Sequence, residues 1–267
     1  MMRNIEALYQ PFISQDPFSS FGLVLDGAAK KILGSRVQRL SQLAPNLVQR
    51  VCTEEPGPRE EVLSLVKPLL GFEVQWFSPW EVIQFLKQWF LTQTGSIRIW
   101  SVGCDQGQEP YSISCAFSEI ENGFRARRPD LSIVATDVSA VCLDRAKQGI
   151  YTRDELQKGV SWIRKRKFFE KVDYHLYQLN SREQERVSFS FQHILKGFHD
   201  LDDFDVILCD QFLPYFSRPL RYALICRLVD RLKPNGYLFL GEARFDLEKF
   251  ANLKPIFIEN RILYQKR

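Results

Sequence analysis

From residue 80 onward, short apolar runs alternate with stretches whose apolar residues recur at helical spacing. The apolar runs predict strands at 96–103, 131–139, 204–210 and 237–243. The amphipathic stretches predict helices at 80–93, 109–124, 140–151 and 218–236. Pro79 suits an early helix position, and Ser139 suits a helix N-cap. This alternation is typical of an α/β fold, with a mostly parallel sheet covered by helices.

The first third of the chain has a different pattern. Residues 21–50 predict a helix, with an apolar stripe formed by Leu33, Val37, Leu40 and Leu43. The segment "TEEPGPREE" that follows contains two prolines and a glycine and predicts a loop. We therefore expect a helical N-terminal domain and linker over 1–90 and an α/β domain over 91–267.

Residues 162–191 interrupt the alternation of strands and helices. The runs "DYHLYQL" and "ERVSFSFQ" alternate at strand period on either side of the turn-like "NSRE". This pattern predicts a β-hairpin subdomain inserted into the α/β domain.

Composition narrows the class of protein. The 267 residues carry a net charge of +4, which is too small to indicate a nucleic-acid partner by itself. The six cysteines form no CxxC pair, and the three histidines form no cluster at zinc spacing, so we expect free thiols and no metal. The N-terminus lacks the apolar core of a signal peptide, and no apolar run is long enough to span a bilayer. These features predict a cytoplasmic protein without membrane insertion.

The turn "IWSVGCDQGQEPYS" at 99–112 carries the candidate chemistry. In open parallel sheets, ligands bind at the carboxyl ends of the strands, and Gly103 and Gly107 would let backbone approach a ligand there. A single G-x-x-x-G also fits an ordinary strand-to-helix turn. Asp137 ends the second strand, where such folds place an acid on ribose hydroxyls. The loop has neither G-x-G-x-x-G nor a P-loop lysine, and Glu109 suits a cationic ligand, which points to S-adenosylmethionine (SAM).

Four segments, in order, resemble the chemotaxis receptor glutamate methyltransferases, the CheR family. "WSVGCDQGQEPYS" resembles that family's W-S-A-G-C-S-T-G-E-E-P-Y-S loop, and "VATDVSAVCLDRAKQGIY" resembles its A-T-D segment. "FDVILCDQFLPYF" and "RLKPNGYLFLGEA" resemble the two segments that follow, and "GLVLDGAAKKILGSRVQRLSQL" resembles the family's small helical domain. The resemblance implies a Rossmann-like class I SAM-dependent methyltransferase.

The resemblance also implies roles for matching positions. Gly103 and Glu109 would line the methionine moiety, Asp137 would bind the adenosine, and Tyr215 would lie near the transferred methyl group. The other positions in these segments that we assign to the cofactor are Cys104, Gly107, Val138, His193 and Gln211. Asp210 joins Tyr215 as a candidate catalytic residue.

Several positions depart from the family pattern. Val74 and Ser78 replace a threonine and an arginine, and Asp210 and Gln211 replace an arginine and an asparagine. Serine cannot form the bidentate pair that arginine forms with a carboxylate, and Asp210 would repel a glutamate. His193 stands where an asparagine is expected.

Three interpretations follow. The first is an active methyltransferase for protein glutamates, whose carboxylate needs no general base. The second is a degenerate relative that binds SAM, S-adenosylhomocysteine (SAH) or a partner protein without catalysis. The third is a methyltransferase for RNA or another nucleophile, with Asp210 or His193 as base.

Partner contacts are expected on two segments. The stretch "WIRKRKFFEK" packs five cations around aromatic residues, which would suit nucleic acid but is more typical of a solvated face. In CheR-like proteins this region forms a small β-subdomain that in some members binds receptor tails by strand addition. The cations of the N-terminal helix, Lys30, Lys31, Arg36 and Arg39, would suit an acidic receptor helix. We expect a chemoreceptor or another signalling protein as partner, and no nucleic acid.

Overall fold

The computed structural model describes residues 74–124, 128–192, 201, 203–210, 213, 218–241 and 250–267. The chain divides into two compact units, one of residues 1–73 and 212–224 and one of residues 74–211 and 225–267. The predicted helix at 21–50, with its four cations, and the predicted loop at 53–61 lie outside the described residues. Each helix in the described ranges is too short or too polar to cross a bilayer.

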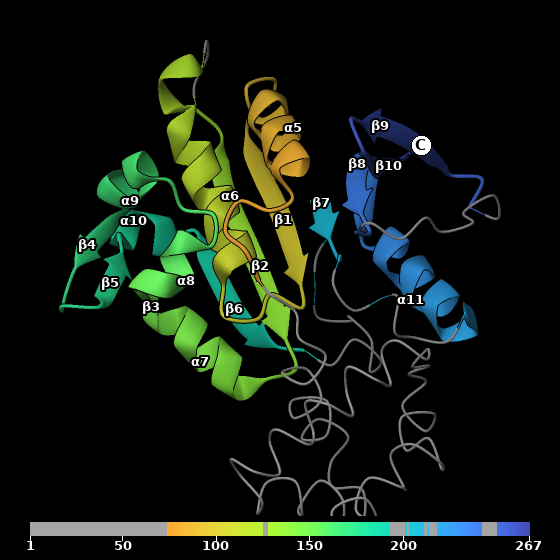
Figure 1. Cartoon of the computed structure of the whole chain (residues 1–267). Helices are drawn as coiled ribbons and strands as arrows, with labels where there is room; N and C mark the ends of the chain where they lie inside the picture. Colours follow the sequence, from red (N-terminus) through yellow and green to blue (C-terminus); the bar gives the residue numbers. More distant parts are fainter. Residues whose placement is uncertain are drawn as a thin grey trace, which may run out of the picture. The chain divides into compact units, whose positions relative to one another are not determined.

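A seven-stranded sheet forms the centre of the second unit (Figure 1). Its strands are β1 (Ser96–Val102), β2 (Asp130–Asp137), β6 (Val187–Phe191), β7 (Phe204–Leu208), β8 (Leu232–Phe239), β9 (Leu253–Ile258) and β10 (Arg261–Lys266). They lie in the order β6-β2-β1-β7-β8-β10-β9. Neighbouring strands are parallel from β6 to β8, and β10 runs antiparallel to both β8 and β9. This is the class I SAM-dependent methyltransferase fold, so the predicted fold class is confirmed.

Helices follow the strands as the apolar pattern predicts. They are α5 (Trp80–Phe90), α6 (Gln108–Glu119), α7 (Ala140–Gln148) and α11 (Arg218–Asp230), with a 3-10 turn at Glu121–Gly123. The helix α5 packs beside α6, and α6 and α7 pack against β2 and β6 (Figure 1). The Ser139 hydroxyl accepts a hydrogen bond from Cys142 N at 3.3 Å, which confirms the predicted N-cap of α7.

The central strands β1 and β7 carry little polar surface. Ile99, Trp100, Val206 and Ile207 are fully buried, as expected for strands covered on both faces. The indole of Trp100 stacks on Phe204 and donates its Nε1–H to Thr136 Oγ1 at 2.9 Å. These contacts fix the register of the strand that leads into the candidate cofactor loop.

The insert between α7 and β6 is a small antiparallel sheet, but the predicted hairpin is wrong. Its elements are β3 (Ile150–Thr152), α8 (Arg153–Gln157), α9 (Trp162–Phe168), β4 (Phe169–Lys171) and β5 (Leu176–Leu179), followed by α10 (Ser181–Gln184). The strand β5 lies between β3 and β4, whereas β6 pairs in parallel with β2 in the main sheet. The segment between β5 and β6 is therefore a helix that changes sheets rather than a hairpin turn.

The C-terminal part differs from its prediction in two places. The helix predicted to 236 ends at Asp230, and the Pro-Asn-Gly segment forms an irregular start of β8, with Asn235 at φ 62°. The pairing shifts there, because Phe204 lies opposite Leu232 while Val206 lies opposite Tyr237. The strand β9 was not predicted, because "LKPIFI" contains a proline and alternates only weakly.

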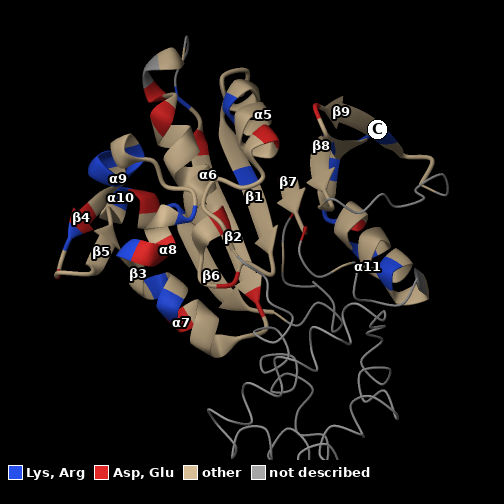
Figure 2. Cartoon of the chain, in the orientation of Figure 1, with Lys and Arg blue, Asp and Glu red and all other residues tan. Residues whose placement is uncertain are grey.

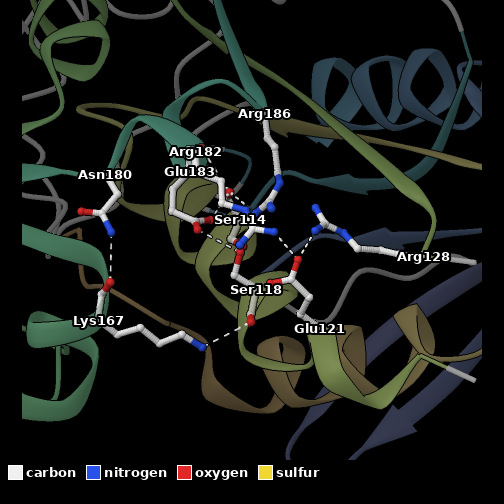
Figure 3. Close-up of polar contacts among 9 residues, drawn as sticks. All are labelled: Ser114, Ser118, Glu121, Arg128, Lys167, Asn180, Arg182, Glu183 and Arg186. Carbon is white, nitrogen blue, oxygen red and sulfur yellow. Dashed lines mark hydrogen bonds and ion pairs between the residues drawn. The ribbon is translucent and has the colours of Figure 1, made fainter.

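A buried polar network fastens α6 to α10 and β6 (Figure 3). Ser114 and Ser118 donate hydrogen bonds to the two carboxylate oxygens of Glu183, at 2.8 and 2.9 Å. Arg186 Nη1 completes the pair, 2.8 Å from Glu183 Oε2. Because Glu183 is 2% exposed, losing one of its partners would leave a buried charge uncompensated. The network therefore holds α6 in one position relative to α10 and β6.

Two glycines with positive φ give a test of the packing between the insert and the segment before α5. A Cβ at Gly159 (φ +115°) would lie 2.2 Å from the carbonyl oxygen of Trp76, whereas a Cβ at Gly95 (φ +84°) meets no atom within 4 Å. We expect Gly159→Ala to lower the free energy of unfolding by about 3 kcal/mol or more, because backbone must move. Gly95→Ala should cost only about 1 kcal/mol, for its dihedral angle alone. Urea unfolding of both variants measures this, and equal losses would contradict the described contact.

Candidate active site

The loop between β1 and α6 is held by the end of the neighbouring strand β2. Gly103 N and Cys104 N both donate to the carbonyl oxygen of Thr136, at 2.7 and 3.0 Å. Gly107 N closes the turn on Cys104 O at 3.0 Å. Gly103 has φ 75°, which favours glycine because it has no Cβ. The loop is thus held in its fold by main-chain bonds.

Gly107 has a packing role in the fold. A Cβ there would lie 3.1 Å from Ala146 Cβ, 3.1 Å from Tyr111 Cε2 and 3.2 Å from Phe189 Cζ. Gly107 is also the N-cap residue of α6, with a φ of 90°. This glycine therefore has a role in seating α6 against α7 and β6, and its predicted place beside a ligand stays a prediction.

Asp137 fixes the same loop from the side. Its Oδ2 accepts from Asp105 N and its Oδ1 accepts from Ser139 N, both at 2.9 Å. The residue is 2% exposed and ends β2, directly before the half-buried Val138.

Glu109 lies in the first turn of α6 and is 9% exposed. Its Oε1 accepts a hydrogen bond from Ser101 Oγ at the end of β1. Burial, together with the negative charge of Asp210, raises the pKa of Glu109 to about 8, although the Ser101 hydrogen bond opposes the shift. A nearby cation would strongly stabilise the ionised form of this buried carboxyl group.

Asp210 is brought to the same end of the sheet by β7, the neighbour of β1. The backbone of Gly241 follows β8 and lies against it, because a Cβ at Gly241 would lie 2.5 Å from Asp210 O. The interaction of Asp210 with Glu109 is the part of the site that sequence reasoning missed. The signal was available, since both carboxylates follow neighbouring strands at the same edge of the predicted sheet.

Two glutamine side chains add acceptors that the sequence did not reveal. Gln106 Oε1 and Gln108 Oε1 are buried and have no protein hydrogen-bond partner. Buried acceptors without protein donors are uncommon in native proteins, and water or a bound group can supply the donor. Two carbonyl oxygens and two carboxylates fit a ligand with an ammonium group and a sulfonium, so the residues present fit SAM.

Some predicted positions cannot be placed. Tyr215, His193 and Gln211 lie outside the described residues. Of the two positions that depart from the family pattern before α5, Val74 is half-buried and Ser78 is exposed. The described residues bring no three His, Cys, Asp or Glu side chains together as metal ligands.

The segment before α5 is nevertheless attached to the candidate site. Phe77 N donates to Ser112 Oγ at 2.8 Å, and that hydroxyl donates to Gln108 O at 2.6 Å. The comparable segment of the family faces cofactor and substrate, and here it is bonded to the first turns of α6.

Comparisons with known proteins agree with this geometry. Residues 80–254 match the family model "CheR methyltransferase, SAM binding domain". Chemotaxis protein methyltransferase 1 of Pseudomonas aeruginosa is 32% identical over 232 residues, which cover 82% of this chain and 84% of the relative. Chemotaxis protein methyltransferase Cher2 of Pseudomonas putida is 31% identical and covers 84% and 88%. Chemotaxis protein methyltransferase 1 of Vibrio cholerae is 30% identical and covers 84% of both chains.

The raised pKa of Glu109 gives a test of the carboxylate pair. Because the folded protein holds this proton up to about pH 8 and the unfolded chain releases it near 4.5, the free energy of unfolding should fall as pH rises between these values. One pKa unit corresponds to about 1.4 kcal/mol, so wild type should lose roughly 3 kcal/mol relative to Glu109→Gln between pH 5 and 8. Urea unfolding of both proteins without ligand measures the difference. Parallel stability curves across this range would contradict a protonated Glu109.

Proposed function

The chain belongs to the CheR methyltransferase family, and from this premise we propose that it transfers the methyl group of SAM to glutamate side chains of a chemoreceptor. The observation that supports this best is the loop after β1. It is held by Thr136 and Asp137 and followed by the buried Glu109, in a chain about 30% identical to chemotaxis protein methyltransferases over most of its length.

SAM, when bound, supplies an activated methyl group. Asp137 would accept hydrogen bonds from the ribose hydroxyls, because it ends the second parallel strand, where folds of this class place an acid on the ribose. Gln106 and Gln108 would accept from the ammonium group, and the charge of Glu109 and Asp210 would stabilise it. Each assignment uses a polar group that the fold has already buried, which reduces the ordering cost of binding.

The protein's part in the reaction is positioning. A glutamate carboxylate is ionised at neutral pH and attacks the methyl carbon directly, so no general base is needed. The sulfur leaves with the electron pair of the broken bond, and no proton moves. The rate then depends on alignment and exclusion of water. Asp210 is compatible with an acidic acceptor when a cation compensates the negative charge it shares with Glu109, and this is how we explain an acid where the family pattern has arginine.

We place receptor binding on the insert. Trp162, Ile163, Val172 and Tyr174 are exposed there, and basic side chains lie along α9 (Figure 2). Residues 150–179 contain seven Lys or Arg against four Asp or Glu. The strands β3 and β4 are the outer strands of the small sheet, and among the described residues each pairs with β5 alone, so either would suit an added strand. A surface of this kind suits an extended acidic segment of a partner protein.

The nucleic-acid alternative is less favoured because the cations of α9 cover the aromatic rings beside them. Arg164 lies 3.6 Å from the ring centroid of Phe77 and forms a two-bond ion pair with Glu119. Lys165 lies 3.6 Å from the centroid of Tyr177. Phe77 and Tyr177 are buried beneath these cations and are not available for stacking on bases, which leaves the exposed Trp162 and Tyr174 as the described rings of this region that could stack.

We also propose a cytoplasmic location, where SAM is available. The described cysteines, Cys104, Cys115, Cys142, Cys209 and Cys226, are free thiols, as is usual in a reducing compartment.

The cofactor assignment predicts a specific loss of affinity in Asp137→Asn. Its amide offers one acceptor oxygen where the carboxylate offers two, so either the loop or the ribose loses a charged hydrogen bond. We expect the SAH dissociation constant to rise about tenfold or more. The matched control is Asp205→Asn, because Asp205 also accepts from a backbone amide, that of Arg98 at 2.8 Å, but near the start of β7. Titration calorimetry should show near-normal affinity for the control; equal losses would contradict the assignment.

The nature of the acceptor predicts the chemistry of the product. Incubation with SAM labelled in its methyl group and a chemoreceptor signalling domain should label glutamates as methyl esters, which alkali releases as methanol. Alkali-stable label would indicate a different nucleophile. SAH binding without any label would support a protein that binds the cofactor without transfer. Asp137→Asn provides the blank, since its labelling at low SAM should fall in proportion to its affinity.

A further inference from the structure

We infer that Tyr151 is a positioning residue for the SAM loop, and that the insert is thereby part of the cofactor site. Tyr151 is the middle residue of β3, the first strand of the insert. Its hydroxyl donates a hydrogen bond of 2.6 Å to the carbonyl oxygen of Gln106, at the centre of the loop. The inference depends on SAM as the ligand of this loop and is independent of the identity of the methyl acceptor.

The Tyr151–Gln106 hydrogen bond anchors the one peptide group that lies between two loop residues already held by other contacts. Asp105 N is held by Asp137 and Gly107 N by Cys104 O, so the residues on either side of Gln106 are anchored by β2 and by the turn. Both residues have positive φ, 51° and 90°, and this is the unusual backbone of the turn. The Tyr151 hydroxyl anchors the peptide group between them and thus completes the set of anchors.

Gln106 connects this anchor with the ligand. Its carbonyl oxygen is used by Tyr151, while its side-chain Oε1 is buried without a protein partner. A residue anchored by its main chain leaves the side chain in a fixed place, with an acceptor available for a bound group. Without the Tyr151 hydroxyl, the same carbonyl would lack its protein donor and the peptide could rotate.

Tyr151 is itself held rigidly by aromatic rings. It is 1% exposed, and its ring packs edge-on against Trp76 at 4.8 Å and Tyr111 at 6.5 Å between centroids. Burial raises its pKa well above the ordinary value, so the hydroxyl stays protonated and remains a donor. The backbone of β3 is fixed by pairing with β5, where Tyr151 lies opposite Tyr177. The hydroxyl therefore has little freedom to follow a displaced loop.

The chain offers a matched control on the same cluster. Tyr111 is also 1% exposed, and its hydroxyl also donates to a backbone carbonyl, that of Ala146 in α7, at 2.8 Å. Phenylalanine at either position removes one hydroxyl and keeps the ring. The two variants should therefore lose similar stability, while only one of them releases the loop.

The test is SAH affinity measured by titration calorimetry, together with melting temperatures and SAM kinetics. We expect Tyr151→Phe to raise the SAH dissociation constant about fivefold, the effect of one neutral hydrogen bond. The KM for SAM should rise by a similar factor, with kcat at saturating SAM within about twofold of wild type. Tyr111→Phe should show a similar drop in melting temperature and a near-normal dissociation constant.

Three results would overturn the inference. They are an unchanged dissociation constant in Tyr151→Phe, equal changes in both variants, and a fall in kcat without a change in KM. Failure to label a chemoreceptor would contradict the proposed acceptor but leave the SAH titration readable, so the two proposals fail separately. A wild-type protein that binds no SAH would overturn this inference together with the cofactor assignment.

Discussion

The attachment of the β1–α6 loop to the end of β2 is the contact on which the rest of the site depends. Thr136 O accepts two main-chain amides of the loop, and the Asp137 carboxylate accepts a third from Asp105. These bonds bring the carboxyl ends of two parallel strands to one place and start α6 at a fixed angle. Since Glu109 is in the first turn of α6, the same bonds decide where its carboxyl group is buried.

The two acids Glu109 and Asp210 make this site favour a positively charged ligand. Helix N-termini favour negative charge, yet desolvation and Asp210 outweigh that effect at Glu109 and raise its pKa to about 8. A second carboxylate beside a buried one is unfavourable in an empty site, and a bound cation converts it into a favourable contact. The carboxylate pair therefore lowers the stability of the ligand-free protein and favours the binding of a positively charged cofactor, as is common at functional sites.

The sequence was sufficient for the features that depend on local rules. Strand period and the order of apolar runs predict the parallel strands β1, β2, β7 and β8, the Ser139 cap is confirmed, and the E-P-Y loop identifies the family. It was insufficient where tertiary pairing decides. The β-period runs around "NSRE" are real strands, but β6 finds its partner in β2, far along the chain, because a parallel edge there buries Val187 and Phe189 against the core. No local pattern distinguishes that pairing from a hairpin.

The site shows the same division between local and tertiary information. Glu109 and Asp137 each lie in a short sequence motif, whereas the Glu109–Asp210 interaction and the Tyr151–Gln106 bond join segments 101 and 45 residues apart. Both long-range contacts bring a residue from a distant part of the chain to the β1–α6 loop and the first turn of α6. The charge of Asp210 acts on Glu109 from the neighbouring strand, and the Tyr151 hydroxyl holds the loop at Gln106 from the insert. The described departures from the family pattern include Val74 and Ser78 before α5 and Asp210 after β7, and the loop itself differs at Asp105, Gln106 and Gln108. The main-chain bonds from Gly103 N and Cys104 N to Thr136 O do not depend on the side chains at these positions, so a change of methyl acceptor would leave those anchors intact.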